Sequence, residues 1–268
     1  MKRREFLKTS LAASGVAGLT PMFNASAAEA SEKGPREFYE LRLYHLQRGA
    51  KQKLFDDFFR EAAIPALNRA GVSPVGVFTV MTGRDSPTMY VLLTYRSLAE
   101  LAAANGRMRA DTDFMKAGGD FLDRPATDPA YVRVESSFMV AFEGMPKLEV
   151  PAAAAGNQPR LFELRTYESH SQKANLKKIE MFNIGEIAIF RRAGLQPVFF
   201  GETLIGARMP NLTYLLVYDN MAARDASWGK FGADPEWKKL STTPGYTDPE
   251  IVSNISNVLL RPAAYSQI

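Results

Sequence analysis

Two polar patterns of the same composition occur in this sequence of 268 residues. Each places a glutamate, an arginine and a tyrosine at alternate positions: Glu40, Arg42 and Tyr44 in the first, and Glu163, Arg165 and Tyr167 in the second. A guanidinium group can hold a carboxylate or enolate oxygen through forked hydrogen bonds, and a tyrosine hydroxyl can donate to a substrate oxygen. These six residues are therefore our candidate ligand-binding residues.

A structural role accounts for the same residues. Within each pattern, the glutamate and the arginine can neutralise each other as an ion pair inside a sheet. The tyrosines can serve as wall aromatics whose hydroxyls are satisfied. The two interpretations are compatible, because an arginine that pairs with one carboxylate still has donors to spare.

The two patterns belong to an internal repeat, since Glu40 and Glu163 are separated by an offset of 123 residues. The same offset, without a gap, relates Arg69–Gly71 to Arg192–Gly194, and the segment 90–95 to the segment 213–218. A repeat of this length indicates a duplicated domain rather than a solenoid, whose period is far shorter. We predict this organisation: signal peptide 1–27, linker 28–36, repeat 1 at 37–143, linker 144–159, repeat 2 at 160–262 and tail 263–268.

The N-terminal segment has the composition of an export signal. Arg3 and Arg4 precede Phe6, a mildly apolar stretch covers about 11–23, and a small-residue cleavage site lies at Ala25–Ala27. The order of these regions predicts twin-arginine export of the folded protein to the periplasm or the medium. The apolar stretch is too short and too polar for a membrane span, which needs about 20 residues, so the mature protein is predicted to have none.

The basic character of the chain lies mainly in that segment. Residues 1–27 have a balance of +3, out of a formal net charge of +4. The remainder is close to neutral, which argues against nucleic acid as a partner, because that needs a clustered basic face. The absence of cysteine from the sequence excludes disulfides, thiolate zinc sites and iron–sulfur clusters.

Apolar periodicity predicts the same element order, β-α-β-β-α-β, in each half, which is the ferredoxin-like split unit. The predicted strands are 38–46, 74–81, 89–95 and 134–142, repeated at 161–169, 197–204, 212–218 and 254–261. The predicted helices are 51–70 and 97–116, repeated at 174–193 and 221–240. Pro65 is expected to kink the first helix, and Gly71 and Gly194 to form left-handed caps. Asp234 is predicted to cap a helix that starts at Pro235.

Strand alternation divides the first strand of each repeat into two faces. We expect Tyr39, Leu41 and Leu43 to meet the helices, and the Glu-Arg-Tyr residues to lie on the opposite face. Two such sheets packed face to face form a closed α/β barrel within one chain, with the six candidate residues pointing into its lumen. The predicted fold class is therefore α+β, two tandem ferredoxin-like units in an intrachain pseudo-dimer. A monomer suffices for this fold, and further homo-oligomerisation stays open.

The sequence resembles the NIPSNAP family, within the dimeric α/β-barrel superfamily, over nearly all of residues 38–262. The Glu-Leu-Arg-x-Tyr start of each repeat is one mark of the family, and the phrase from Trp228 to Trp237 is another. Repeat 1 lacks the second mark, with Asn105, Met108 and Phe114 in place of Trp228, Phe231 and Trp237. If one repeat carries chemistry, repeat 2 is the better candidate on this basis.

The resemblance implies no settled activity, although neighbouring families include cofactor-independent monooxygenases and haem-handling enzymes. We predict a small-molecule ligand in the lumen, and the first functional hypothesis is catalysis on a small aromatic or enolisable substrate, with Glu40, Glu163 or Glu202 as a base. The alternative is a non-catalytic binding or interaction protein whose Glu-Arg pairs are structural.

We predict no cofactor and no metal site. Haem is the alternative, and it would need one of the only two histidines, His45 or His170, as its histidine ligand. The two are not equivalent in the repeat, because the offset matches them to Glu168 and Gln47. His45 is expected on the helix side as a strand-end histidine.

Overall fold

The computed structural model describes residues 35–81, 87–152 and 160–268. The predicted signal peptide, residues 28–34 of the first linker and residues 153–159 of the second lie outside the described residues. Within the described ranges, every helix is too short or too polar to cross a bilayer.

Both repeats have the predicted element order. In repeat 1 the strands are β1 (Phe38–His45), β2 (Val75–Val80), β3 (Thr88–Tyr95) and β4 (Arg133–Ala141). Its helical segments are α1 (Lys51–Phe58), η1 (Phe59–Ala63), α2 (Ile64–Arg69), α3 (Leu98–Ala110), α4 (Thr112–Ala117) and α5 (Gly119–Leu122).

Repeat 2 follows the same plan after the connector. Its strands are β5 (Leu161–Glu168), β6 (Gln196–Ile205), β7 (Asn211–Tyr218) and β8 (Asn254–Pro262). Its helical segments are α6 (Gln172–Met181), η3 (Phe182–Glu186), α7 (Ile187–Ala193), α8 (Met221–Ala233), α9 (Pro235–Ser241) and α10 (Asp248–Ile251).

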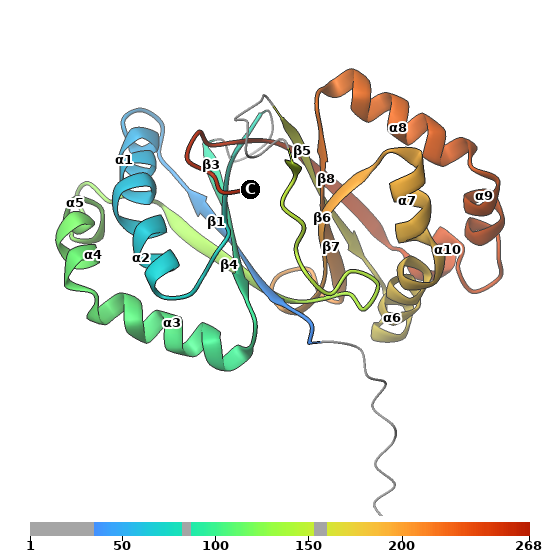
Figure 1. The fold of residues 1–268 in the computed structure, drawn as a ribbon, viewed down its shortest axis with the longest axis horizontal. Helices are drawn as coiled ribbons and strands as arrows, with labels where there is room; N and C mark the ends of the chain where they lie inside the picture. Colours follow the sequence, from blue (N-terminus) through green and yellow to red (C-terminus); the bar gives the residue numbers. More distant parts are fainter. Residues whose placement is uncertain (1–34, 82–86, 153–159) are drawn as a thin grey trace, which may run out of the picture. The chain divides into compact units, whose positions relative to one another are not determined.

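The eight strands form one closed barrel in the order β1-β3-β2-β8-β5-β7-β6-β4 (Figure 1). All neighbouring strands are antiparallel, and the two repeats are joined where β2 pairs with β8 and β4 pairs with β6. The predicted fold class is thus confirmed. Because direction alternates around the ring, β1 and β5 run the same way, and their C-terminal ends lie at the same end of the barrel.

The lumen is apolar where the two repeats meet. Tyr39 and Leu41 of β1 share a buried cluster with Phe162 and Leu164 of β5, and Ile268 at the end of the chain is buried in the same cluster. An eight-stranded barrel has an interior just wide enough for side chains to fill. This cluster closes the end of the lumen at which β1 and β5 begin.

The predicted orientation of the two strand faces was wrong. Tyr39 and Leu41 point into the lumen, whereas Tyr44 packs with Phe55 and Phe59 of the helices. The six candidate residues therefore lie outside the barrel wall, on the face that the helices cover. The physical reason is that a buried charge needs hydrogen-bond partners, which the helix layer supplies and the apolar cluster of the lumen does not.

The first long helix of each repeat contains a π-helical segment, at η1 and at η3. Pro65 lies in the first turn of α2, directly after η1, where its missing N–H is tolerated. The segment recurs in repeat 2, where Ala188 occupies the equivalent position, so proline is not its cause. The predicted caps are confirmed, because Gly71 and Gly194 have positive φ angles of 85° and 87°, and the Asp234 side chain accepts from the Trp237 N–H.

We predict that Phe162→Ala strongly destabilises the protein, because this side chain is 0% exposed and its ring centroid lies 4.9 Å from that of Phe78 across the lumen. The expected loss is about 3–5 kcal/mol in the free energy of unfolding, measured by urea denaturation. Ile184→Ala is the control, because Ile184 is 59% exposed and should change stability little. Equal effects of the two substitutions would contradict the lumen packing.

Candidate functional site

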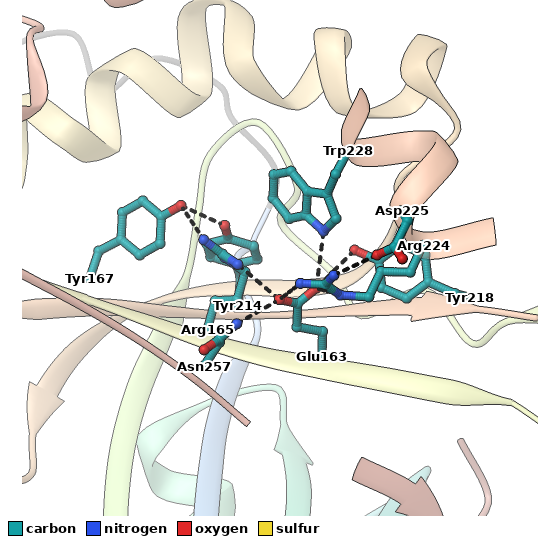
Figure 2. Close-up of polar contacts among 9 residues, drawn as sticks. All are labelled: Glu163, Arg165, Tyr167, Tyr214, Tyr218, Arg224, Asp225, Trp228 and Asn257. Atoms are coloured by element: carbon teal, nitrogen blue, oxygen red, sulfur yellow. Dashed lines mark hydrogen bonds and ion pairs between the residues drawn. The ribbon is translucent and has the colours of Figure 1, made fainter. Parts of the chain in front are cut away.

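The carboxylate of Glu163 is the centre of a buried polar network in repeat 2 (Figure 2). Its side chain is 0% exposed. Arg224 donates from Nη2 at 2.7 Å and from Nε at 2.8 Å, so the two groups form a bidentate pair. The other donors are Arg165 at 2.8 Å, Trp228 at 3.0 Å, Asn257 at 3.0 Å and Tyr218 at 3.3 Å.

These donors decide the charge of Glu163. Burial by itself would raise the pKa of this carboxyl, but the hydrogen bonds from Arg224, Asn257 and Trp228 and the charge of Arg165 outweigh it and lower the pKa to about 2. Glu163 is therefore ionised at neutral pH and is unsuited to act there as a general base. The predicted ion pair of Glu163 with Arg165 is present.

Arg165 is enclosed by aromatic groups. Its guanidinium carbon lies 4.7 Å from the ring centroid of Trp228, within cation–π range. Its Nη2 donates to the Tyr167 hydroxyl at 3.3 Å, and Tyr214 donates to the same hydroxyl at 3.0 Å. The indole of Trp228 thus stacks on Arg165 and binds Glu163 at once.

Repeat 1 contains a simpler form of the network. Arg42 donates to Glu40 from Nε at 2.7 Å and from Nη2 at 2.8 Å. Tyr95 and Ser136, the counterparts of Tyr218 and Asn257, add hydrogen bonds of 3.1 and 2.8 Å. Burial opposes ionisation, but these hydrogen bonds hold the pKa of Glu40 below its usual value.

An open pocket of about 640 Å³ lies beside Arg42, between the barrel wall and the helices of repeat 1. Asn105 and Met108 line it at the positions where repeat 2 has Trp228 and Phe231. The remaining lining consists of aliphatic side chains, the charged Arg109, Asp123 and Arg124, and six aromatic side chains: Tyr44, Phe58, Phe59, Phe114, Phe121 and Tyr131. The structure thus places an open space in repeat 1, at the position that an indole fills in repeat 2.

The sequence analysis missed a buried ion pair of Lys178 with Glu186, whose Nζ and Oε2 atoms are 3.2 Å apart. Their side chains are 1% and 2% exposed, and the Lys178 ammonium also lies 5.5 Å from the Tyr167 ring centroid. Burial raises the pKa of Glu186, although Lys178 opposes that shift. Repeat 1 has Phe55 and Ala63 at the equivalent positions, so this pair belongs to repeat 2 alone.

His45 and His170 do not meet. His45 is 8% exposed and lines the barrel mouth rather than the helix side, so the predicted side was wrong, because alternation places it on the same strand face as Leu41 and Leu43. His170 is exposed. Neither lines the pocket of repeat 1, so that pocket offers no histidine ligand to a haem iron. Glu202 accepts from Gln172 at 3.3 Å and belongs to neither Glu-Arg network.

The barrel of two fused ferredoxin-like units, each with a Glu-Arg pair under its helices, defines a tandem α/β-barrel protein. The NIPSNAP family model matches residues 39–143 and 162–267. The chain belongs to the NIPSNAP family and contains two tandem copies of its domain.

Solved structures share the fold at low sequence identity. A protein of Fusobacterium nucleatum described as a "putative monooxygenase" is 9% identical, with a TM-score of 0.54 over 85% of this chain and 92% of its own. One of Lactobacillus acidophilus with the same description is 10% identical, with a TM-score of 0.50 over 85% and 94%. A NIPSNAP-like protein of Burkholderia xenovorans is 21% identical over 40% and 88%, with a TM-score of 0.36. No curated protein matches the chain.

We predict that Glu163→Gln changes how the free energy of unfolding depends on pH in the acidic range. A carboxyl whose folded pKa is about 2, below the unfolded value near 4.5, stabilises the fold above pH 4.5 and loses this effect as the pH falls toward 2. At pH 7 the variant should be less stable by about 3–5 kcal/mol, because two arginines lose their carboxylate. As the pH falls from 5 to 3, the difference in the free energy of unfolding between the variant and the unsubstituted protein should become smaller, as measured by urea denaturation.

Glu61→Gln is the control for this series, because the Glu61 side chain is 64% exposed. Its stability should run parallel to that of the unsubstituted protein. A constant gap between Glu163→Gln and the parent at all pH values would show that Glu163 does not have the low pKa.

Proposed function

We propose that repeat 1 binds a small aromatic or enolisable molecule in the pocket beside Arg42. One observation carries the proposal: the two repeats share the Glu-Arg network, but Trp228 covers the arginine in repeat 2 and Asn105 leaves it open in repeat 1. A pocket lined mostly by aliphatic and aromatic side chains, with a few placed polar groups, is the usual form of a small-molecule site.

Arg42 supplies the polar recognition in this proposal. Glu40 accepts from its Nε and Nη2 atoms, and because a guanidinium group has five N–H donors, donors remain for a ligand oxygen. The Glu40 carboxylate fixes the plane of the guanidinium, and its own charge is met by Tyr95 and Ser136 as well. A donor held in this way would stabilise the oxygen charge that develops when a bound enolisable compound loses a proton.

The second candidate is a non-catalytic interaction protein. Its support is an apolar rim around the same pocket, where Met115, Leu122 and Tyr131 are 46%, 39% and 39% exposed. Val134, also in the lining, is 38% exposed. In this alternative the Glu-Arg pairs are structural in both repeats, and a partner's side chain fills the pocket of repeat 1.

We further propose that residues 1–27 direct twin-arginine export, on the sequence pattern alone. Replacing Arg3 and Arg4 together by lysine should retain the full-length precursor in the cytoplasm, measured by fractionation and intact mass. The unsubstituted chain should yield a shortened periplasmic form. Equal processing of both forms would contradict this route of export.

We predict that Asn105→Trp closes the pocket of repeat 1, because tryptophan is the residue that the equivalent helix position carries in repeat 2. The probe is 2-naphthol, an aromatic whose deprotonated form has an enolate-like oxygen, and binding is measured by isothermal titration calorimetry. The substitution should weaken binding at least tenfold and leave the melting temperature nearly unchanged. Undiminished binding would contradict the proposal.

Arg42→Met and Arg165→Met form a matched pair for the role of the arginines. Arg42→Met should weaken 2-naphthol binding about tenfold or more, as expected for loss of a hydrogen bond to a charged group, worth about 1.5–3 kcal/mol. Arg165→Met should lower the melting temperature and leave binding intact. If Arg42→Met keeps binding and only destabilises the fold, the structural alternative is favoured.

A further inference from the structure

The second half of the barrel lumen is open. A cavity of about 1170 Å³ lies at the end of the barrel where β1 and β5 terminate, and strands of both repeats line it. It lies on the opposite side of the barrel wall from the pocket of repeat 1, since Arg42 and Leu43 are neighbours on β1 but line different spaces. It is thus separate from the site proposed above.

The cavity has an apolar floor and, on one side, a wall of hydroxyl groups. Leu41 and Leu164 lie deepest, next to the apolar cluster of the lumen. One step nearer the mouth, strand register places Thr166 level with Thr213 on β7 and with Ser256 on β8. Repeat 1 has Leu43, Tyr90 and Glu135 at the equivalent level.

The hydroxyl wall is held in place by its own contacts. The Oγ1 atoms of Thr166 and Thr213 are 2.9 Å apart, and Arg208 donates to Ser256 at 3.0 Å. Arg208 has a φ angle of 59°, and the Asn211 side chain donates to its carbonyl at 3.0 Å. Arg208 thus has a backbone conformation that residues other than glycine rarely adopt, and specific hydrogen bonds hold it at the mouth.

The charges at the mouth are already compensated. Arg133 donates to Glu135 at 2.7 Å, and His45 lies 3.2 Å from the same carboxylate. Arg208 lies 3.6 Å from Glu168. An ionic ligand would therefore add a charge without a free counterpart, which is unfavourable in a partly buried space.

We propose that this open half of the lumen is a second binding site, which takes an uncharged amphiphile. Its apolar body lies against Leu41, Leu43 and Leu164, and its hydroxyl or carbonyl groups meet Thr166, Thr213 and Ser256. Hydroxyl side chains suit such groups because each can both donate and accept.

The test uses octyl glucoside, an alkyl chain with an uncharged sugar, below its critical micelle concentration, by isothermal titration calorimetry. Thr213→Tyr is the blocking variant, because repeat 1 carries Tyr90 at the equivalent position. Asn105→Trp is the matched control, since it fills the other pocket. We expect saturable one-to-one binding to the unsubstituted protein, at least tenfold weaker binding to Thr213→Tyr, and unchanged binding to Asn105→Trp.

Octanoate tests the charge requirement and should bind at least tenfold more weakly than octyl glucoside. Thr213→Val, which removes the hydroxyl at nearly constant size, should weaken octyl glucoside binding severalfold and serves if Thr213→Tyr does not fold. The proposal is overturned if octyl glucoside does not saturate at one site, if both Thr213 variants bind it undiminished, or if octanoate binds as tightly. None of these outcomes bears on 2-naphthol binding in repeat 1.

Discussion

Closure of the barrel is the constraint on which the rest of the structure depends. The β2–β8 and β4–β6 pairs leave no free edge in the ring, so each strand has one face toward a narrow lumen and one toward the helices or solvent. The lumen admits the apolar set that includes Tyr39 and Phe162. The Glu-Arg-Tyr set must then lie beneath the helices, where each carboxylate can find several donors.

The two repeats differ in whether the arginine of the Glu-Arg pair is enclosed or lies beside an open pocket. Glu163 and Glu40 are held by the same kinds of residue from the same strands, but only Glu163 has a second arginine and an indole. These additions give the Glu163 carboxylate more hydrogen-bond donors than Glu40 has, although the buried Nε of Arg165 has no hydrogen-bond partner among the described residues. Repeat 1 has fewer partners and retains space beside Arg42. The open pocket therefore depends on the residues that differ between the copies rather than on those they share.

The sequence allowed the repeat, the element order, the closed barrel and the Asp234 cap to be predicted, because these depend on local patterns and on the offset. It did not determine which strand face is inside. An alternating row of apolar residues can pack equally well against a helix layer or inside a lumen, as with Tyr39, Leu41 and Leu43. Alternation separates the two faces of a strand but does not say which one is inside. Nor could it show Arg224 and Trp228 on Glu163, because contacts between α8 and β5 arise from tertiary packing. The pocket of repeat 1 follows from small side chains on α3, which had been interpreted as loss of a family mark.

The π-helical segments indicate that one irregularity is older than the duplication. Phe59–Ala63 and Phe182–Glu186 occupy equivalent positions, although their sequences share only the first residue. In a regular α-helix, residues eight apart differ by about 80° around the axis, but one extra residue in a π turn nearly restores their alignment. Lys178 and Glu186 can pair for this reason, and Phe55 and Ala63 can share one core. Two copies with different side chains have thus inherited the same insertion as a fixed part of their shared ancestor's backbone.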